Sequence, residues 1–172
     1  MPKRAEVMSA QRETVEVRKS PIHGRGVYAR KTIPKGTRII EYTGKRIPWK
    51  DALEAPPQFP DEPFHTFYFG LENDEVIDAG KGGNEARWIN HSCVPNCETA
   101  EENHRIFVDA LRMIRRGEEL YYDYRIVPGE RRTKQLERQY ICRCGSTKCR
   151  GTMLEPKQKR RKRQTARKVK LA

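Results

Sequence analysis

The sequence predicts a mostly β fold of the β-rich α+β class, built from several small antiparallel sheets. Short β-branched and aromatic runs recur between turn residues, and Gly and Pro are frequent, with 12 and 11 among 172 residues. No part of the chain alternates strands with long amphipathic helices, which argues against a doubly wound parallel sheet. The length fits one compact domain that buries a core and carries short tails.

Eight short segments are expected to be strands because they are rich in β-branched or aromatic residues and end at turn residues. They lie at residues 14–20, 26–32, within 33–44, 64–73, 76–80, 97–100, 105–114 and within 115–124. The sixth and seventh should pair as a hairpin. At most one short helix fits the Pro-rich, charged region 45–63, near Trp49 to Ala55. Asn84 should cap a helical turn that follows it.

The positive charge is concentrated at the C-terminus. The formal net charge is +13, and residues 157–172 hold nine Lys or Arg and no acidic residue, which leaves +4 for residues 1–156. Such a tail cannot bury enough apolar surface to fold alone, so we expect it to be disordered. Contact with nucleic acid and a nuclear-import signal are the two functional interpretations.

The chain shows no apolar run that could span a bilayer and no signal-peptide core, so no membrane partner is expected. Five cysteines are present, and an odd number argues against a pure disulfide framework. Cys142, Cys144 and Cys149 crowd into CRCGSTKC, a spacing typical of Zn²⁺ ligation in a reducing, intracellular compartment. Cys97 is the natural candidate for the fourth ligand, and unligated thiols are the alternative. A nucleus or a bacterial nucleoid would fit these features.

Three further motifs suggest a ligand pocket. The string NHSCVPNC, residues 90–97, is dense in hydrogen-bonding groups and follows Arg87. In EELYYDY, alternation along a strand places Tyr122 and Tyr124 on one side and Tyr121 on the other. The turn HGRG offers close backbone approach to a ligand. Each motif alone also has an ordinary structural explanation as a polar turn, as strand packing or as a simple turn.

Together, and in this order, HGRGVYA, EYTGKRI, NEARWINHSCVPNC, GEELYYDY and CRCGSTKCRG resemble the SET-domain protein-lysine methyltransferases with a post-SET segment. The resemblance implies a SET fold of small sheets around a threaded pseudoknot, which strand counts alone could not suggest. It also implies a pocket for S-adenosylmethionine on one face, a substrate-lysine channel on the other, and a C-terminal zinc site. The expected organisation is a lead-in (1–13), a SET domain (14–125), a post-SET segment (126–154) and a basic tail (155–172).

The resemblance implies roles for single residues. Tyr124, Tyr42 and Tyr122 match the catalytic tyrosines, and Tyr122 falls where Phe or Tyr tunes product multiplicity. The implied cofactor-binding residues are Arg25, Gly26, Phe67, Arg87, Asn90, His91 and Leu154, and the implied zinc ligands are Cys97, Cys142, Cys144 and Cys149. The chain departs from the family pattern at Trp88, where Phe is usual, and at Phe67, where many relatives have Tyr. It also lacks the cysteine-rich pre-SET cluster.

These residues imply transfer of a methyl group from S-adenosylmethionine to a lysine amine. Free lysine has a pKa of about 10.4, so the site must favour the uncharged amine, which a dry channel and a nearby positive sulfur both do. Tyr122 leads us to expect mainly monomethylation. The substrate should be a lysine-containing, basic tail: a histone, a bacterial nucleoid protein or a ribosomal component. The alternative is a catalytically weak SET-fold protein that its basic tail tethers to nucleic acid.

The tail itself contains a candidate acceptor. Residues 164–168 read QTARK, a run that also occurs in the N-terminal tail of a core histone. Lys168 is therefore a candidate automethylation site, helped by the high effective concentration of a tethered segment. Coincidence within a basic, low-complexity sequence is the competing interpretation.

Overall fold

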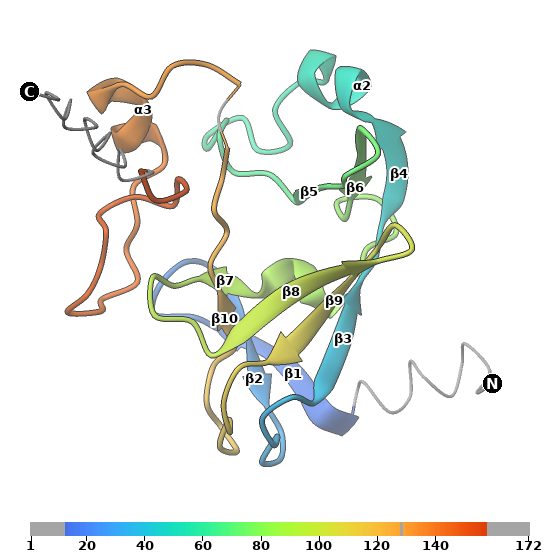
Figure 1. Ribbon diagram of the computed structural model, residues 1–172, viewed down its shortest axis with the longest axis vertical. Helices are drawn as coiled ribbons and strands as arrows, with labels where there is room; N and C mark the ends of the chain where they lie inside the picture. The colour runs from blue at the N-terminus through green and yellow to red at the C-terminus, as the bar shows by residue number, and fades with distance from the viewer. Residues whose placement is uncertain (1–12, 128, 158–172) are drawn as a thin grey trace, which may run out of the picture.

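The computed structural model describes residues 13–127 and 129–157. In chain order the elements are β1 (Val15–Lys19), β2 (Arg25–Ala29), β3 (Arg38–Tyr42), β4 (Lys45–Pro48), α2 (Trp49–Glu54), β5 (Tyr68–Gly70), β6 (Glu75–Asp78), the 3-10 helix η1 (Glu85–Trp88), β7 (Asn90–His91), β8 (Cys97–Glu102), β9 (Arg105–Ala110), β10 (Tyr121–Tyr122) and α3 (Lys134–Gln139). Their strands form four small sheets, three of them antiparallel, so the expected β-rich class is confirmed (Figure 1).

The three-stranded sheet β3–β9–β8 lies at the centre of the lower body in Figure 1. In β9, Ile106, Val108 and Ala110 are buried and alternate with less buried neighbours, as expected for a strand with one face toward the core. The expected hairpin of β8 and β9 is present. Asn103 and His104 turn it with positive φ angles of 51° and 58°, a turn conformation that matches strand twist.

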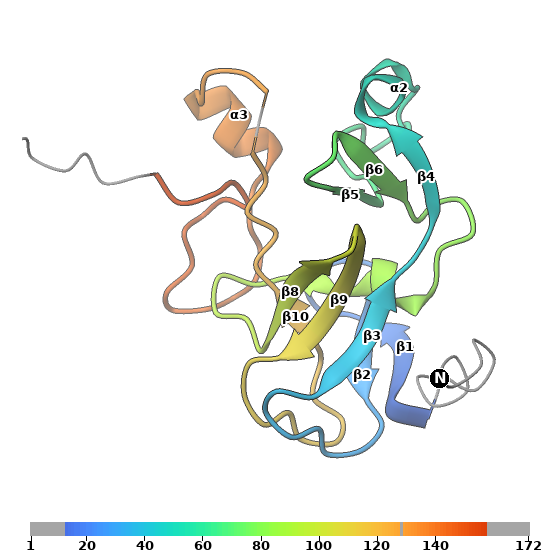
Figure 2. The same ribbon diagram turned by 45° about the vertical axis from the view of Figure 1, so that its right-hand side comes forward.

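A second antiparallel sheet, β4–β6–β5, stands above this body together with α2 (Figure 2). The helix α2 confirms the short helix expected near Trp49, and η1 with its Asn84 cap is also confirmed, since the Asn84 side chain accepts a hydrogen bond from the Ala86 N–H. Strand β4 was not expected. Lys45 and Arg46 are exposed at this edge, so its sequence lacks the apolar alternation that marks a half-buried strand.

Strands β7 and β10 pair in parallel, with Tyr121 beside Asn90 and Tyr122 beside His91. The fully buried Asn96 joins the two segments. Its Nδ2 donates to the Glu119 carbonyl at 2.8 Å, and its Oδ1 accepts from the Tyr121 N–H at 2.8 Å. Residues 90–97 and 119–124 therefore lie side by side, the contact that the expected pseudoknot requires.

The C-terminal segment carries a helix that the sequence did not reveal. Thr133 caps α3 by accepting from the Leu136 N–H at 3.1 Å, and Leu136 is the one residue of α3 that is buried. Backbone hydrogen bonds from Ile126 to Met153 and from Met153 to Tyr140 hold this segment to the chain that leaves β10. Lys168 and most of the basic tail lie outside the described residues.

The core is one cluster of aliphatic and aromatic side chains shared by all four sheets. Its fully buried large members include Val27, Ile33, Ile40, Ile89, Ile106, Val108, Ile114 and Leu120. Among the helices in the described ranges, none has both the length and the apolar character needed to cross a membrane.

Gly44 links β3 to β4 at a point where two backbones touch. A Cβ atom there would lie 2.4 Å from the Asp78 carbonyl oxygen, so Gly44→Ala must push β4 and β6 apart. We expect a loss of about 1–3 kcal/mol in the free energy of unfolding, measured by urea denaturation. Gly70→Ala is the matched control, because its nearest contact would be 3.8 Å, to the Trp49 ring. Equal stability of the two variants would contradict this prediction.

Candidate functional site

A cleft of about 1290 Å³ runs between the β4–β6–β5 sheet, the lower body and the C-terminal segment. Its lining comes from segments that are far apart in the chain. They are the turn between β1 and β2, the stretch that leads into β5 and β5 itself, parts of η1, β7 and β10, and several residues between 125 and 153. Most of the residues expected to bind cofactor or act in catalysis line it. They are Arg25, Tyr42, Phe67, Arg87, Asn90, His91, Tyr122 and Tyr124.

The three expected catalytic tyrosines meet at this cleft. The rings of Tyr122 and Tyr124 lie 4.9 Å apart, and Phe69 bridges Tyr42 and Tyr122 with centroid distances of 5.3 and 6.2 Å. Tyr42 donates to the Phe67 carbonyl at 3.0 Å, and Tyr124 donates to the Ile89 carbonyl at 2.8 Å. The hydroxyls of two of these tyrosines are thus fixed by backbone carbonyls.

Burial raises the pKa of all three tyrosines, so each hydroxyl stays protonated at neutral pH. The Tyr122 side chain lines the cleft between Phe69 and Tyr124, with ring centroids 6.2 and 4.9 Å away.

His91 is held as a neutral ring. Its Nδ1 accepts a hydrogen bond from the Tyr124 N–H at 3.1 Å, which leaves the ring proton on Nε2, 3.4 Å from the Cys93 sulfur. Burial lowers the pKa of His91 to about 4, partly opposed by Asp123. The 3.5 Å approach of Asp123 Oδ1 to Nδ1 is accordingly not an ion pair at neutral pH. A ring with its lone pair engaged cannot act as a general base.

Asn90 fixes the turn between β1 and β2. Its Nδ2 donates to the Arg25 carbonyl at 2.8 Å and to Glu119 Oε1 at 3.0 Å. The buried Glu119 also accepts from the hydroxyls of Tyr28 and Tyr121, at 2.8 and 3.0 Å. Sequence reasoning missed Glu119, because one acid in a charged run carries no signal of burial.

Glu119 also explains Gly26. A Cβ atom at this position would lie 2.1 Å from Glu119 Oε1, so only glycine leaves room for the carboxylate. Gly26 is not part of the cleft lining, whereas Gly24 and Arg25 are. The structure therefore gives Gly26 a packing role, and the part of the turn that lines the cleft is Gly24 and Arg25.

Aromatic and guanidinium groups stack along one wall of the cleft. Trp88 packs edge-on against Phe67 at 4.8 Å, and the Arg25 and Arg87 guanidinium groups lie 4.9 and 5.1 Å from the Trp88 ring. Arg87 donates to the Ala79 carbonyl at 3.0 Å, but its buried Nε has no partner in the described structure. An unsatisfied cationic donor beside an aromatic wall suits a ligand with a carboxylate and a ring.

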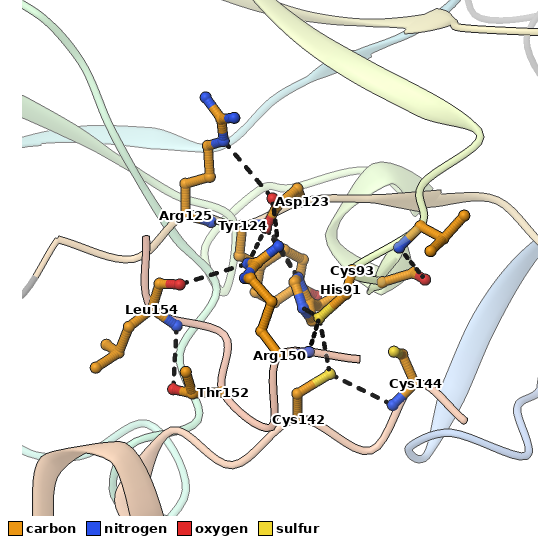
Figure 3. A network of polar contacts seen from close by, with 12 residues as sticks. His91, Cys93, Asp123, Tyr124, Arg125, Cys142, Cys144, Arg150, Thr152 and Leu154 are labelled. Carbon is orange, nitrogen blue, oxygen red and sulfur yellow. Dashed lines mark hydrogen bonds and ion pairs between the residues drawn. The ribbon is translucent and has the colours of Figure 1, made fainter. Parts of the chain in front are cut away.

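Four cysteines form a cluster: the sulfur atoms of Cys93, Cys142, Cys144 and Cys149 all lie within 4.8 Å of one another. Figure 3 shows the first three of them. The Cys93 and Cys142 sulfurs are 3.7 Å apart, close to the edge of roughly 3.8 Å that Zn–S bonds of about 2.3 Å give in a tetrahedron. Burial opposes ionisation of Cys144, but hydrogen bonds from the Cys93 and Ser146 backbones outweigh it and lower its pKa to about 6. The geometry and chemistry fit a structural Zn²⁺ ion.

Cys97 is not in this cluster, so its assignment as the fourth ligand is wrong. It begins β8, is fully buried in the apolar core, and donates to Asn96 Oδ1 at 3.5 Å. Burial raises the pKa of Cys97 to about 12, which disfavours the thiolate that a metal needs. Cys93 takes its place because the turn after β7 faces the C-terminal segment.

Leu154 was also misplaced in the cofactor pocket. Its side chain is fully buried, and its backbone forms an isolated parallel β-bridge with Ile126. Leu154 is absent from the cleft lining. Met153 lines the cleft in its stead. The side chains of neighbouring residues in an extended segment point to opposite sides, so a cleft that Met153 lines is one that Leu154 does not reach.

An Arg150–Asp123 ion pair connects the cysteine cluster to the tyrosines. Arg150 donates twice to the Asp123 carboxylate, at 2.7 and 2.9 Å, and its backbone N–H donates to the Cys93 sulfur at 3.3 Å (Figure 3). Hydrogen bonds from Arg150 lower the pKa of Asp123 against the opposing effect of burial. Cys93, His91, Asp123 and Tyr124 thus form one connected unit.

Comparison with known proteins agrees with this geometry. Residues 24–125 match the family model of the SET domain. The chain is 37% identical over 148 residues to a Mycosarcoma maydis protein named histone-lysine N-methyltransferase, H3 lysine-4 specific, covering 83% of this chain and 10% of that protein. It is 38% identical over 143 residues to human histone-lysine N-methyltransferase 2B, covering 81% of this chain and 5% of that protein.

A third relative is the Drosophila melanogaster histone-lysine N-methyltransferase trr, 38% identical over 146 residues, which covers 83% of this chain and 6% of that protein. The chain belongs to the SET-domain family. It spans about a tenth or less of the length of these relatives.

The cysteine cluster predicts opposite results for two neighbouring cysteines. Cys93→Ala should lower the zinc content of the purified protein and its thermal midpoint, because a four-thiolate site loses one ligand. Cys97→Ala should keep the wild-type zinc content although it leaves a cavity in the core. The zinc content per chain is measured by metal analysis of both variants with their thiols kept reduced, and the thermal midpoint by a melting curve. Zinc loss in the Cys97 variant alone would contradict the assignment.

Proposed function

We propose that this chain transfers a methyl group from S-adenosylmethionine to a lysine side chain of a basic protein, with a histone tail as the preferred substrate. The observation that carries the proposal is the meeting of Tyr42, Tyr122 and Tyr124 at one end of an aromatic cleft. The printed names of the relatives support a histone, and H3 is the first substrate to test.

The cleft suits S-adenosylmethionine in its chemistry. Arg87, with a buried Nε that lacks a partner, would take the carboxylate, while Trp88 and Phe67 offer faces and edges for the adenine ring. Backbone at Gly24 and Arg25 would approach the ligand closely, and Met153 would close over it. When bound, this cofactor supplies a methyl group on a positively charged sulfur.

The tyrosines would aim the lysine nitrogen. Their hydroxyls stay protonated and are set in position by the Phe67 and Ile89 carbonyls, so they can hydrogen-bond the amine but cannot remove its proton. His91 cannot do so either, because its Nδ1 is engaged. The amine would therefore arrive uncharged and form the new N–C bond with its lone pair while the S–C bond of the methyl donor breaks and leaves a neutral thioether. The methylated ammonium would then release a proton to solvent.

Two carboxylates near Trp49 would suit a basic substrate on that side of the cleft. Asp74 and Glu75 line the cleft next to Trp49, and the backbone N–H of Trp49 donates to the Asp74 carbonyl at 2.9 Å. Trp49 is 43% exposed, which offers an apolar surface beside two carboxylates. A lysine-containing peptide would find charge complementarity and a stacking surface there.

The zinc site and the tail complete the proposal. Zn²⁺ in the cysteine cluster would tie the C-terminal segment over the cleft, since Cys93 belongs to the turn after β7 while the other three ligands follow α3. The tail's positive charge, which lies almost entirely outside the described residues, supports nucleic-acid contact and leaves Lys168 as a candidate automethylation site.

Replacing Tyr124 by Phe tests the proposed function. Loss of the hydroxyl should lower turnover on an H3 peptide by roughly 10²-fold, as for removal of one preorganised hydrogen-bonding group. Binding of S-adenosylmethionine, measured by calorimetry, should be unchanged. The control is Tyr68→Phe at the cleft rim, which should retain activity. Wild-type protein that binds no cofactor when loaded with zinc would overturn the proposal.

Tyr122 predicts the degree of methylation. Tyr122 lines the cleft beside Tyr124, where its hydroxyl would hold a water or the amine itself, so a methylated amine should turn poorly and monomethyl-lysine should dominate. Tyr122→Phe should shift the products toward di- and trimethyl-lysine, as read by mass spectrometry of a peptide with one lysine. Trimethyl-lysine as the main wild-type product would contradict this role.

A further inference from the structure

A second group of metal-binding side chains lies at the rim of the cleft, apart from the cysteine cluster. His23 belongs to the turn between β1 and β2, whereas Glu62 and His65 belong to the stretch between α2 and β5. All three residues line the cleft. Their ligand atoms, two imidazole nitrogens and a carboxylate oxygen, lie within 4.8 Å of one another.

The distances agree with ligands that share one ion. His23 Nε2 is 3.2 Å from both carboxylate oxygens of Glu62, and His65 Nδ1 is 3.1 Å from Glu62 Oε2. Ligands about 2.0–2.2 Å from a zinc-class ion are separated by roughly 3.0–3.5 Å from their neighbours in its coordination shell. Small movements would therefore convert this hydrogen-bonded trio into a coordination site.

Packing and backbone contacts preorganise the trio. The His65 ring stacks on Phe59 at 4.4 Å and meets the edge of Phe67 at 5.3 Å, which sets its plane. The His65 N–H donates to the Glu62 carbonyl at 2.8 Å, so a local turn brings these two side chains together. The His23 ring stands edge-on to His65 at 4.8 Å.

The accessibility of the trio also suits a bound ion. The three side chains are 29–52% exposed, which leaves room for water ligands and for entry of the ion.

We propose that His23, Glu62 and His65 form a binding site for a divalent transition-metal ion of the zinc class, with water in the remaining positions. Two imidazoles and one carboxylate are a ligand set that Zn²⁺, Co²⁺ and Ni²⁺ accept. The ion would join the turn before β2 to the stretch before β5. Because both stretches line the cleft, the bound metal would fix the separation of its two walls.

Metal stoichiometry tests the site directly. The full chain, without a polyhistidine tag and with its thiols reduced, is dialysed against buffered Zn²⁺, and zinc per chain is measured for wild type, His65→Asn and Glu62→Gln. Each variant should bind one zinc ion per chain fewer than wild type. If it still binds that ion, the dissociation constant should be at least tenfold higher than in wild type. The comparison holds whether or not the cysteine cluster is filled, so failure of the zinc-thiolate site would be seen separately.

His104→Asn is the matched control. The chain has four histidines, of which His91 is buried. His104 is 54% exposed and 3.4 Å from Glu101, and no third ligand group joins them within residues 13–127 and 129–157. This variant should keep the wild-type stoichiometry. The proposal is overturned if His65→Asn and Glu62→Gln bind as much zinc as wild type with the same affinity, or if His104→Asn loses as much as they do.

Discussion

The side-chain amide of Asn96 joins two segments that are more than twenty residues apart, and the shape of the cleft depends on that junction. Its oxygen accepts from Tyr121 and its nitrogen donates to the Glu119 carbonyl, both at 2.8 Å and out of contact with water. A buried amide that satisfies two backbone groups is costly to replace. It fixes β10 beside β7, and so it sets where Tyr122 and Tyr124 lie relative to Asn90 and His91.

From that junction the contacts continue in two directions. Asn90 and Glu119 hold the turn at Arg25 on one side of the cleft. On the other side, His91 and Asp123 lead to Cys93 and Arg150, and hence to the C-terminal segment. Hydrogen bonds therefore connect the tyrosine cluster to the cysteine cluster. A shift of the Cys93 side chain would change the position of His91, and His91 accepts a hydrogen bond from the Tyr124 backbone.

The sequence predicted the strands that alternate apolar and polar residues, such as β9, and the short helices with clear caps or boundaries. It did not predict β4, whose charged residues face solvent, or α3, which buries only Leu136. A strand or helix that buries almost no apolar side chain shows no apolar periodicity in its sequence, so it cannot be predicted from that pattern. The three tyrosines that the motif resemblance singled out, each within a short, specific string, all line one cleft.

The errors at the site share one physical cause: spacing identifies a motif but not the direction of each side chain. Cys93 and Cys97 both lie in NHSCVPNC, yet one points to the cysteine cluster and the other into the core. Met153 and Leu154 are exchanged in the same way. The trio of His23, Glu62 and His65 could not be seen at all, because 39 residues separate His23 from Glu62.

The anchoring of Tyr42 has a wider consequence. Its hydroxyl is held by the main-chain oxygen of residue 67 and not by that residue's side chain. A carbonyl is the same in every amino acid, so a mutation at this position can reshape its side of the cleft without removing the group that anchors the Tyr42 hydroxyl. Under the proposed function, the pocket for the methyl donor could then be adapted to cofactor analogues while Tyr42 keeps its anchor.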